Sequence, residues 1–138
     1  CLEALAAGPA IARKARACIL HGQDTIMKDM VRGCVENITA KTVGEAAARG
    51  DILAREIIDK TGEYLGIGVA NLINVINPDT IVIGGGVSNM GELLLAPLRR
   101  AAGRRAIKAA FEKVRIVKAE LASEAGLVGA VCLALGQV

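Results

Sequence analysis

The chain has 138 residues, of which 53% are hydrophobic and 22% charged, and its formal net charge is +3. This composition excludes a disordered chain, and a single domain of this length buries roughly two-thirds of the surface that its unfolded chain exposes. Tyr64 and Phe111 are the only aromatic residues, so the core must consist of Ala, Leu, Ile and Val. Such a core favours a sheet covered by helices.

Neither a membrane span nor a signal peptide is predicted. The four cysteines (Cys1, Cys18, Cys34 and Cys132) form no C-x-x-C pair, and we expect reduced thiols in a cytoplasmic protein. Because the sequence begins at Cys1 without a methionine, we expect a processed chain or a piece of a longer one.

The N-terminal third predicts helices. A short helix is expected over residues 2–7, ended by Gly8, and Pro9 suits the first turn of the next helix, which runs to about Ile19. Residues 24–33 are expected to be helical, with Ile26, Met27, Met30 and Val31 on one face. Residues 42–45 (Thr-Val-Gly-Glu) fit a capping box for a short helix that Gly50 can close.

A long helix follows, capped by Asp51 and running to about Ile76. From Leu65 onward it is apolar nearly all round, which predicts that this half is buried. Small or polar residues recur every four positions and would let a neighbouring element approach closely. This stripe consists of Gly62, Gly66, Ala70 and Asn74.

The most informative segment is a predicted strand, Thr80 to Ile83, that runs into three consecutive glycines. Glycine costs about 0.5–1 kcal/mol in a regular element, so three in a row need a reason. One reason is close approach of a flat or anionic ligand to the main chain, and the other is a tight turn. The sixth position of G-x-G-x-x-G falls on Asn89 and no Gly-Lys-Ser/Thr follows, so neither phosphate-binding fingerprint is complete.

The rest of the chain predicts helix, strand and helix. Asn89 is expected to cap a helix towards Gly103, residues 114–119 alternate as a second strand, and Ser123 can cap a last helix through Leu135. Strands separated by helices predict an α/β fold with parallel pairing. Ligands of such sheets bind at the carboxyl ends of the strands, where Gly84–Gly86 lie.

Positive charge gathers between residues 99 and 118, opposed only by Glu112. With one aromatic and no reading motif, this segment is interpreted as a solvated helix face rather than a nucleic-acid interface. The basic residues are Arg99, Arg100, Arg104, Arg105, Lys108, Lys113, Arg115 and Lys118.

Three segments together resemble the ROK family of bacterial sugar kinases, open reading frames and repressors, and within it the glucokinases. The first is Cys1-Leu2-Glu3-Ala4 with Gly8-Pro9-Ala10, the second runs from Asn77-Pro78-Asp79 to Gly86-Val87, and the third is residues 124–130. They stand in family order and span the whole chain. The resemblance implies an actin-like, ribonuclease-H-like ATPase fold, with residues 1–138 forming most of the second lobe and the first lobe and the start of the zinc loop absent.

The resemblance also implies site residues. Glu3 would accept hydrogen bonds from sugar hydroxyls, and Cys1 would be one ligand of a structural zinc ion. The nucleotide would lie against Gly84, Gly85, Gly86 and Val87. The catalytic base, the D-x-G-x-T phosphate loop and the E-x-G-H segment do not occur here, and His21 stands on the wrong side of Cys1 to be the zinc histidine.

We therefore expect part of an ATP-dependent hexose kinase, a glucokinase, that uses Mg²⁺ and transfers the γ-phosphate to the sugar 6-hydroxyl. The isolated chain is expected to be inactive and to self-associate through the apolar face that meets the missing lobe, and the family's habit suggests a homo-oligomer. One alternative is the sugar-sensing lobe of a ROK-type repressor, which would bind nucleic acid through an upstream segment. An unrelated dinucleotide-binding domain is the weaker alternative.

Overall fold

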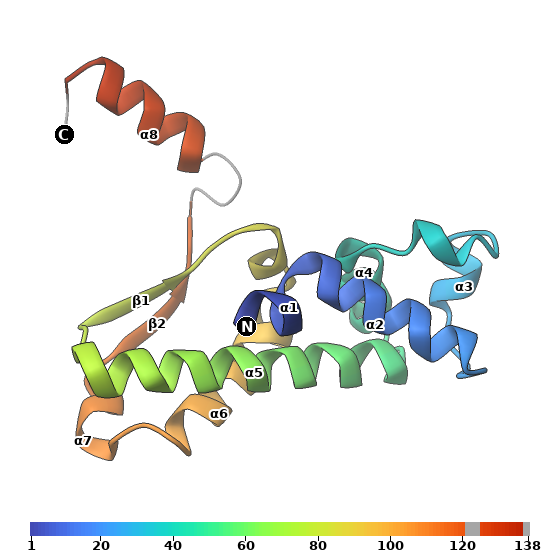
Figure 1. The fold of residues 1–138 in the computed structure, drawn as a ribbon, viewed down its shortest axis with the longest axis horizontal. Coiled ribbons are helices and arrows are strands. Elements are labelled where there is room, and N and C mark those ends of the chain that lie inside the picture. Colours follow the sequence, from blue (N-terminus) through green and yellow to red (C-terminus); the bar gives the residue numbers. More distant parts are fainter. Residues whose placement is uncertain (121–124, 137–138) are drawn as a thin grey trace.

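The 25-residue helix α5 (Ile52–Ile76) runs along the body of the molecule (Figure 1). The computed structural model describes residues 1–120 and 125–136. In chain order the elements are α1 (Leu2–Ala6), α2 (Gly8–Leu20), α3 (Met27–Met30), η1 (Val35–Asn37), α4 (Ala40–Ala48), α5, β1 (Thr80–Ile83), η2 (Gly86–Met90), α6 (Glu92–Gly103), α7 (Lys108–Phe111), β2 (Arg115–Lys118) and α8 (Ala125–Ala134). Helices α1, α2, α4, α6 and α7 pack against α5. No helix of the described residues is long and apolar enough to cross a membrane.

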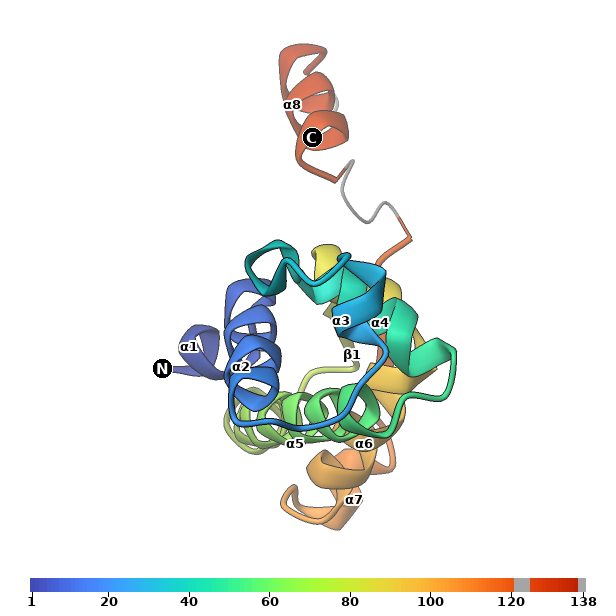
Figure 2. The same cartoon turned by 90° about the vertical axis from the view of Figure 1, so that its right-hand side faces the viewer.

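Two hydrophobic cores lie at the two ends of α5. One joins the first half of α5 to α2 and α4, and Leu94 of α6 belongs to it. The other joins the second half of α5 to α6 and the inner face of the sheet, with Ile116 of β2 buried in it. Figure 2 looks along α5 and shows α1 and α2 over one side of this helix and α6 along another. These cores fix the relative positions of the helices and the strands.

The sheet has two parallel strands, as predicted. Thr80 pairs with Arg115 and Val82 with Val117, so Ile81, Ile83 and Ile116 point to the core and the two valines point outward. The connection from β1 to β2 passes through η2, α6 and α7. This arrangement confirms the α/β interpretation.

Both ends of α5 follow from the sequence. The Asp51 carboxylate accepts a hydrogen bond from the Ala54 N–H at 2.8 Å, as predicted for an N-cap, and it also accepts from the Ile26 N–H and the Thr25 hydroxyl, each at 2.9 Å. At the other end Asn77 takes the left-handed conformation (φ 49°) that commonly ends a helix.

Two predicted caps are wrong. Helix α4 begins at Ala40, because Thr39 and Thr42 exchange side-chain to main-chain hydrogen bonds of 3.2 and 3.3 Å, so Thr42 is the third helical residue rather than the cap. Helix α6 is preceded by Gly91 (φ 58°), and Asn89 belongs to the 3₁₀ turn η2. In both cases the helix follows a different residue from the one that the sequence pattern marked. Thr39 precedes α4, and Gly91 precedes α6.

The other boundaries differ in detail. Gly8 begins α2 rather than ending α1, because Ala7 between them is extended, and Pro9 stands in the first turn of α2 as predicted. Only residues 27–30 of the expected helix 24–33 are α-helical. Ser123, the predicted cap of the last helix, lies outside the described residues.

The glycine stripe of α5 is a packing surface, as predicted. A Cβ on Gly62 would lie 2.6 Å from Pro97 Cγ, and one on Gly66 would lie 2.5 Å from the Leu98 carbonyl oxygen and 2.6 Å from Ala101 Cβ. Farther along the stripe, the Asn74 carboxamide accepts a hydrogen bond from the Ile107 N–H at 2.8 Å. Helices α5 and α6 therefore touch backbone to backbone.

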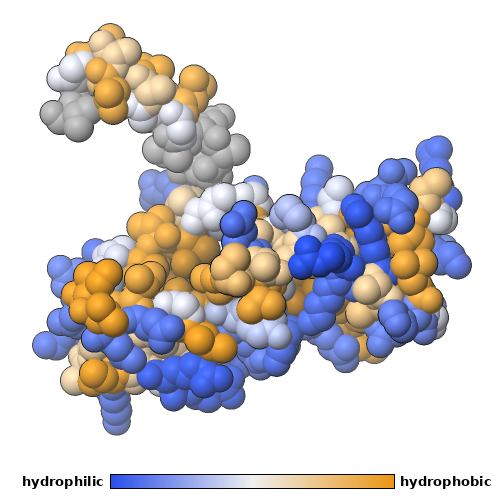
Figure 3. Space-filling model, in the orientation of Figure 1, coloured by the Kyte–Doolittle hydropathy of each residue, from blue (hydrophilic) through white to orange (hydrophobic). Residues whose placement is uncertain are grey.

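The expected all-round burial of the second half of α5 is wrong for the described residues. Leu72, Val75 and Ile76 are exposed, Val75 by 83%, and Val82 and Val117 of the sheet are exposed as well. Helix α8 stands apart from the other helices in Figure 1, and Figure 3 shows apolar side chains on its surface. These surfaces agree with the apolar face that the sequence predicted, and self-association through them stays a prediction.

Replacing Gly66 with alanine is expected to lower the free energy of unfolding by about 1–3 kcal/mol, since the methyl group would overlap the backbone of α6. Urea denaturation measures the change. Gly129→Ala in α8 is the matched control, because a Cβ there meets no described atom within 4 Å, and its stability should be unchanged or slightly higher. Equal effects at the two positions would contradict close packing at Gly66.

Asp51→Ala should lower the free energy of unfolding by about 1 kcal/mol at neutral pH. Partial burial raises the pKa of Asp51, but the hydrogen bonds to its carboxylate outweigh this effect, so the pKa lies below its ordinary value of 3.8. A carboxylate with a lowered pKa stabilises the fold above the ordinary value and loses this contribution as the pH falls through the folded value. The difference between wild type and variant should therefore be constant from about pH 5 upward and shrink below about pH 4.

Denaturation curves at several pH values measure this difference. Asp24→Ala, at an exposed aspartate in the segment between α2 and α3, should give little change. A difference that grew towards low pH would be incompatible with the proposed cap.

Candidate functional site

The chain leaves β1 through a rigid glycine turn. Gly85 has φ 81°, a conformation that favours glycine, and its carbonyl oxygen accepts hydrogen bonds from the Ser88 hydroxyl (2.7 Å) and the Ser88 N–H (3.1 Å). Ser88 is completely buried, which fixes the start of η2. The need for a tight turn thus explains Gly85.

A tight turn does not explain Gly86. Its φ is not positive, and a Cβ built on it meets no described atom within 4 Å. Gly84 differs, because its Cβ would make ordinary contact with Ala119 at 3.6 Å. Since neither strain nor a protein neighbour requires glycine at position 86, the missing side chain leaves open space in front of the turn.

A cavity of about 360 Å³ lies between this turn and α1. Glu3 of α1 and the glycines of the turn line it together, although they are far apart in the sequence. Helix α1 is held there by α5, because Gly68 leaves room for the Leu2 side chain, whose Cδ2 would lie 2.9 Å from a Cβ at that position. The predicted sugar-contacting residue and the predicted nucleotide turn therefore share one cavity.

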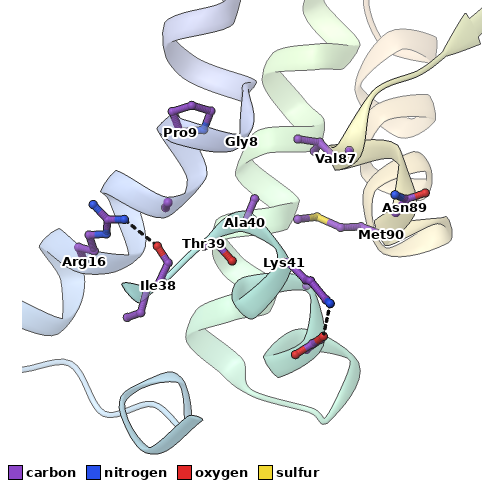
Figure 4. Close-up of a pocket in the computed structure, with 14 residues that line it drawn as sticks. Gly8, Pro9, Arg16, Ile38, Thr39, Ala40, Lys41, Val87, Asn89 and Met90 are labelled. Atoms are coloured by element: carbon purple, nitrogen blue, oxygen red, sulfur yellow. Dashed lines mark hydrogen bonds and ion pairs between the residues drawn. The ribbon is translucent and has the colours of Figure 1, made fainter. Parts of the chain in front are cut away.

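A second cavity of about 860 Å³ opens between α2, α4 and η2 (Figure 4). Its walls are largely apolar: Gly8, Pro9 and Ala12 come from α2, Ala40 and Gly44 from α4, and Val87 and Met90 from η2. Polar side chains lie among them. These are Arg16, Thr39, Lys41, Glu45 and Asn89.

The two cavities adjoin. Gly8, Gly86 and Val87 line both of them, so the glycine turn forms a common wall. The sequence predicted the turn but not the larger cavity. Its walls come from three segments that are far apart in the sequence, and no spacing motif joins them.

The predicted metal ligand stands alone. Cys1 is exposed, and the described residues contain no group of three His, Cys, Asp or Glu side chains that could hold a metal ion. His21 is exposed at the end of α2, where its Nδ1 donates to the Ala17 carbonyl at 2.6 Å, in agreement with the interpretation as a polar-loop residue. A zinc site at Cys1 would need ligands from outside this chain.

The basic segment is partly structural. Arg99 donates two hydrogen bonds to the Glu92 carboxylate and two to the Ile116 carbonyl, which joins α6 to β2. Arg100 pairs with Asp59 of α5 at 3.4 Å. These contacts support the interpretation as a solvated, structurally engaged face.

This fold and site define the class of protein. The parallel strand pair with its glycine turn is consistent with part of an actin-like ATPase lobe, the fold of ROK sugar kinases that the chain resembles in structure. The chain superposes with a TM-score of 0.85 on the crystal structure of a ROK family glucokinase from Streptomyces griseus in complex with glucose and AMPPNP, at 33% identity, over 96% of this chain and 44% of that one.

The sequence matches the ROK family over residues 1–137, and the chain belongs to this family. It is 36% identical over 130 residues to a glucokinase from Halalkalibacterium halodurans, covering 94% of this chain and 39% of the relative. It is also 34% identical over 104 residues to a xylose repressor from Caldicellulosiruptor bescii, covering 75% of this chain and 26% of the relative. The chain thus spans less than half the length of either relative, and both kinases and repressors resemble it.

Proposed function

We propose that this chain is most of the C-terminal lobe of an ATP-dependent hexose kinase of the glucokinase type, which transfers the γ-phosphate of ATP to the sugar 6-hydroxyl. The observation that carries the proposal is the common wall that Gly86 and Val87 form between two cavities, one of which begins at Glu3. A phosphoryl transfer needs two ligands held side by side with their reacting ends adjacent. Adjoining cavities separated by a glycine turn meet this requirement.

In this proposal the two cavities have different ligands. The base and ribose of ATP occupy the larger, mostly apolar cavity, and the phosphates lie against the main chain of the glycine turn, with Mg²⁺ bound to them. Glu3 accepts hydrogen bonds from sugar hydroxyls in the smaller cavity, because two carboxylate oxygens match vicinal donors. An aspartate outside this chain takes the proton from the sugar hydroxyl.

The remaining parts of the proposed enzyme need residues beyond those of this chain. Cys1 supplies one thiolate of a structural zinc site whose other ligands precede it in the full-length protein. The first lobe closes over the two ligands and excludes water. Without that lobe the 138-residue chain is inactive.

The similarity to the xylose repressor favours a second candidate, the sugar-sensing lobe of a ROK-type repressor. Formation of glucose 6-phosphate from glucose and MgATP by the full-length protein distinguishes the two. Turnover supports the kinase. Sugar-dependent binding to operator DNA without turnover supports the repressor.

Glu3→Gln in the full-length protein should raise the KM for glucose by roughly tenfold or more, since a hydrogen-bonded hydroxyl loses its charged acceptor. The KM for ATP should change little, because Glu3 lies in the smaller cavity only. Steady-state kinetics with each substrate varied in turn measures both values. Glu56→Gln, an exposed carboxylate of α5 outside both cavities, is the matched control, and an unaltered glucose KM in Glu3→Gln would remove Glu3 from the site.

Gly86→Val should weaken nucleotide binding by about tenfold or more while changing the free energy of unfolding by no more than about 0.5 kcal/mol. The reason is that the new side chain enters open space between the cavities rather than a packed core. Titration calorimetry with AMPPNP and urea denaturation measure the two quantities. Gly85→Ala, in contrast, should lower the free energy of unfolding, because the φ of 81° at this position strains any residue other than glycine.

A further inference from the structure

The side chain of Met90 forms part of the wall of the larger cavity. Met90 ends η2, and Figure 4 shows its thioether extending from that turn towards α4. There it packs on Gly44, since a Cβ at this position would lie 3.2 Å from Met90 Cγ and 3.6 Å from Met90 Cε. Both residues line the cavity, so their contact closes its side between η2 and α4.

Four of the five polar side chains of the lining have a hydrogen-bond or ion-pair partner within the protein. The Arg16 guanidinium donates to the Ile38 carbonyl at 2.8 Å, and the Thr39 hydroxyl belongs to the capping box of α4. Lys41 and Glu45 lie 3.9 Å apart as a surface ion pair. Asn89 points away from Met90 on the other side of the turn (Figure 4). The cavity therefore offers mainly shape, and Arg16 Nε is the one buried side-chain donor of the described residues that lacks a hydrogen-bond partner.

Methionine is suited to such a wall. Its unbranched chain and its polarisable sulfur adapt to the flat face or edge of an aromatic ring. Because Gly44 has no side chain, Met90 can pack closely against α4 at the edge of the cavity. With any larger residue at position 44, the Met90 side chain would have to shift, and it would move into the cavity, which is the adjoining open space.

We propose that Met90, seated on Gly44, sets the size limit for the base of the nucleotide and makes this pair the specificity-determining element of the larger cavity. The proposal rests on the assignment of that cavity to ATP. A base enters until its exocyclic edge meets the thioether. Analogues that carry a bulky group at this edge are excluded by Met90 and by no other side chain on this wall.

The first experiment is Met90→Ala in the full-length protein, with ATP and N6-benzyl-ATP as the two probes. The ratio of kcat/KM for N6-benzyl-ATP to that for ATP should rise by at least about tenfold, because a hole replaces the wall. Displacement of a fluorescent ATP analogue should give the same change in relative affinity without turnover. The glucose KM should stay constant.

Met30→Ala is the matched control. Met30 is half-buried like Met90 and packs against the same hydrophobic core, but it does not line the cavity. It should reproduce any loss of stability in Met90→Ala and leave the ratio of the two nucleotides unchanged. A changed ratio in both variants would overturn the proposal, since a general loosening of the core would then explain it.

The second experiment is Gly44→Ala, which approaches the same contact from α4. Alanine is the better helix former by about 0.5–1 kcal/mol, so the fold is retained. The displaced Met90 should raise the KM for ATP by roughly threefold or more, and Met90→Ala in the same chain should restore it. Additive effects of the two substitutions would overturn the coupling.

The outcomes separate this proposal from the function on which it rests. A wild-type protein that binds neither ATP nor AMPPNP overturns both. A wild-type protein that binds ATP, together with a Met90→Ala variant whose ratio of kcat/KM for N6-benzyl-ATP to that for ATP is unchanged, overturns only the role of Met90 as a size limit.

Discussion

The contact between α5 and α6 is the constraint on which the rest of the structure depends. Two glycines of α5, Gly62 and Gly66, let α6 approach so closely that a Cβ added at either would lie less than 3 Å from a backbone oxygen of α6. Because α6 follows directly after η2, this contact sets the position of the turn relative to α5. It also carries the inner face of the sheet, since Ile116 packs against both helices. A shift of α6 would therefore move one wall of each cavity.

Much of the fold could be predicted, because its signals are local. The cap at Asp51, the turn after Ile76, the parallel strands and the small-residue stripe each depend on a few neighbouring residues. The wrong predictions arose where two local patterns competed. Thr39 and Thr42 both suit a cap, and the hydrogen bonds decided for Thr39. Burial of the end of α5 was wrong for another reason, since apolar periodicity does not say which partner covers a face.

The site was predictable only in part. Three consecutive glycines after a strand predicted the glycine turn. Resemblance to a family singled out Glu3, which lines the other side of the smaller cavity. The larger cavity had no such signal. Tertiary packing brings together Gly8, Gly44 and Met90 in its lining. In the sequence, none of these residues differs from an ordinary helix or loop residue. The structure also gives different explanations for two of the three glycines. The positive φ of Gly85 requires glycine, whereas Gly86 leaves open space in front of the turn.

The two-stranded sheet leaves an open edge on each side within the described residues. Within the described residues, β1 and β2 hydrogen-bond only to each other, so each presents an outer row of main-chain N–H and C=O groups. Such edges are templates for a further strand, and natural proteins cover or charge them. Arg115 and Lys118 place charge along β2, whereas β1 carries none. Strand β1 is thus the side on which the sheet would be extended, and the register Thr80–Ile83 sets which residues of an added strand would face the core.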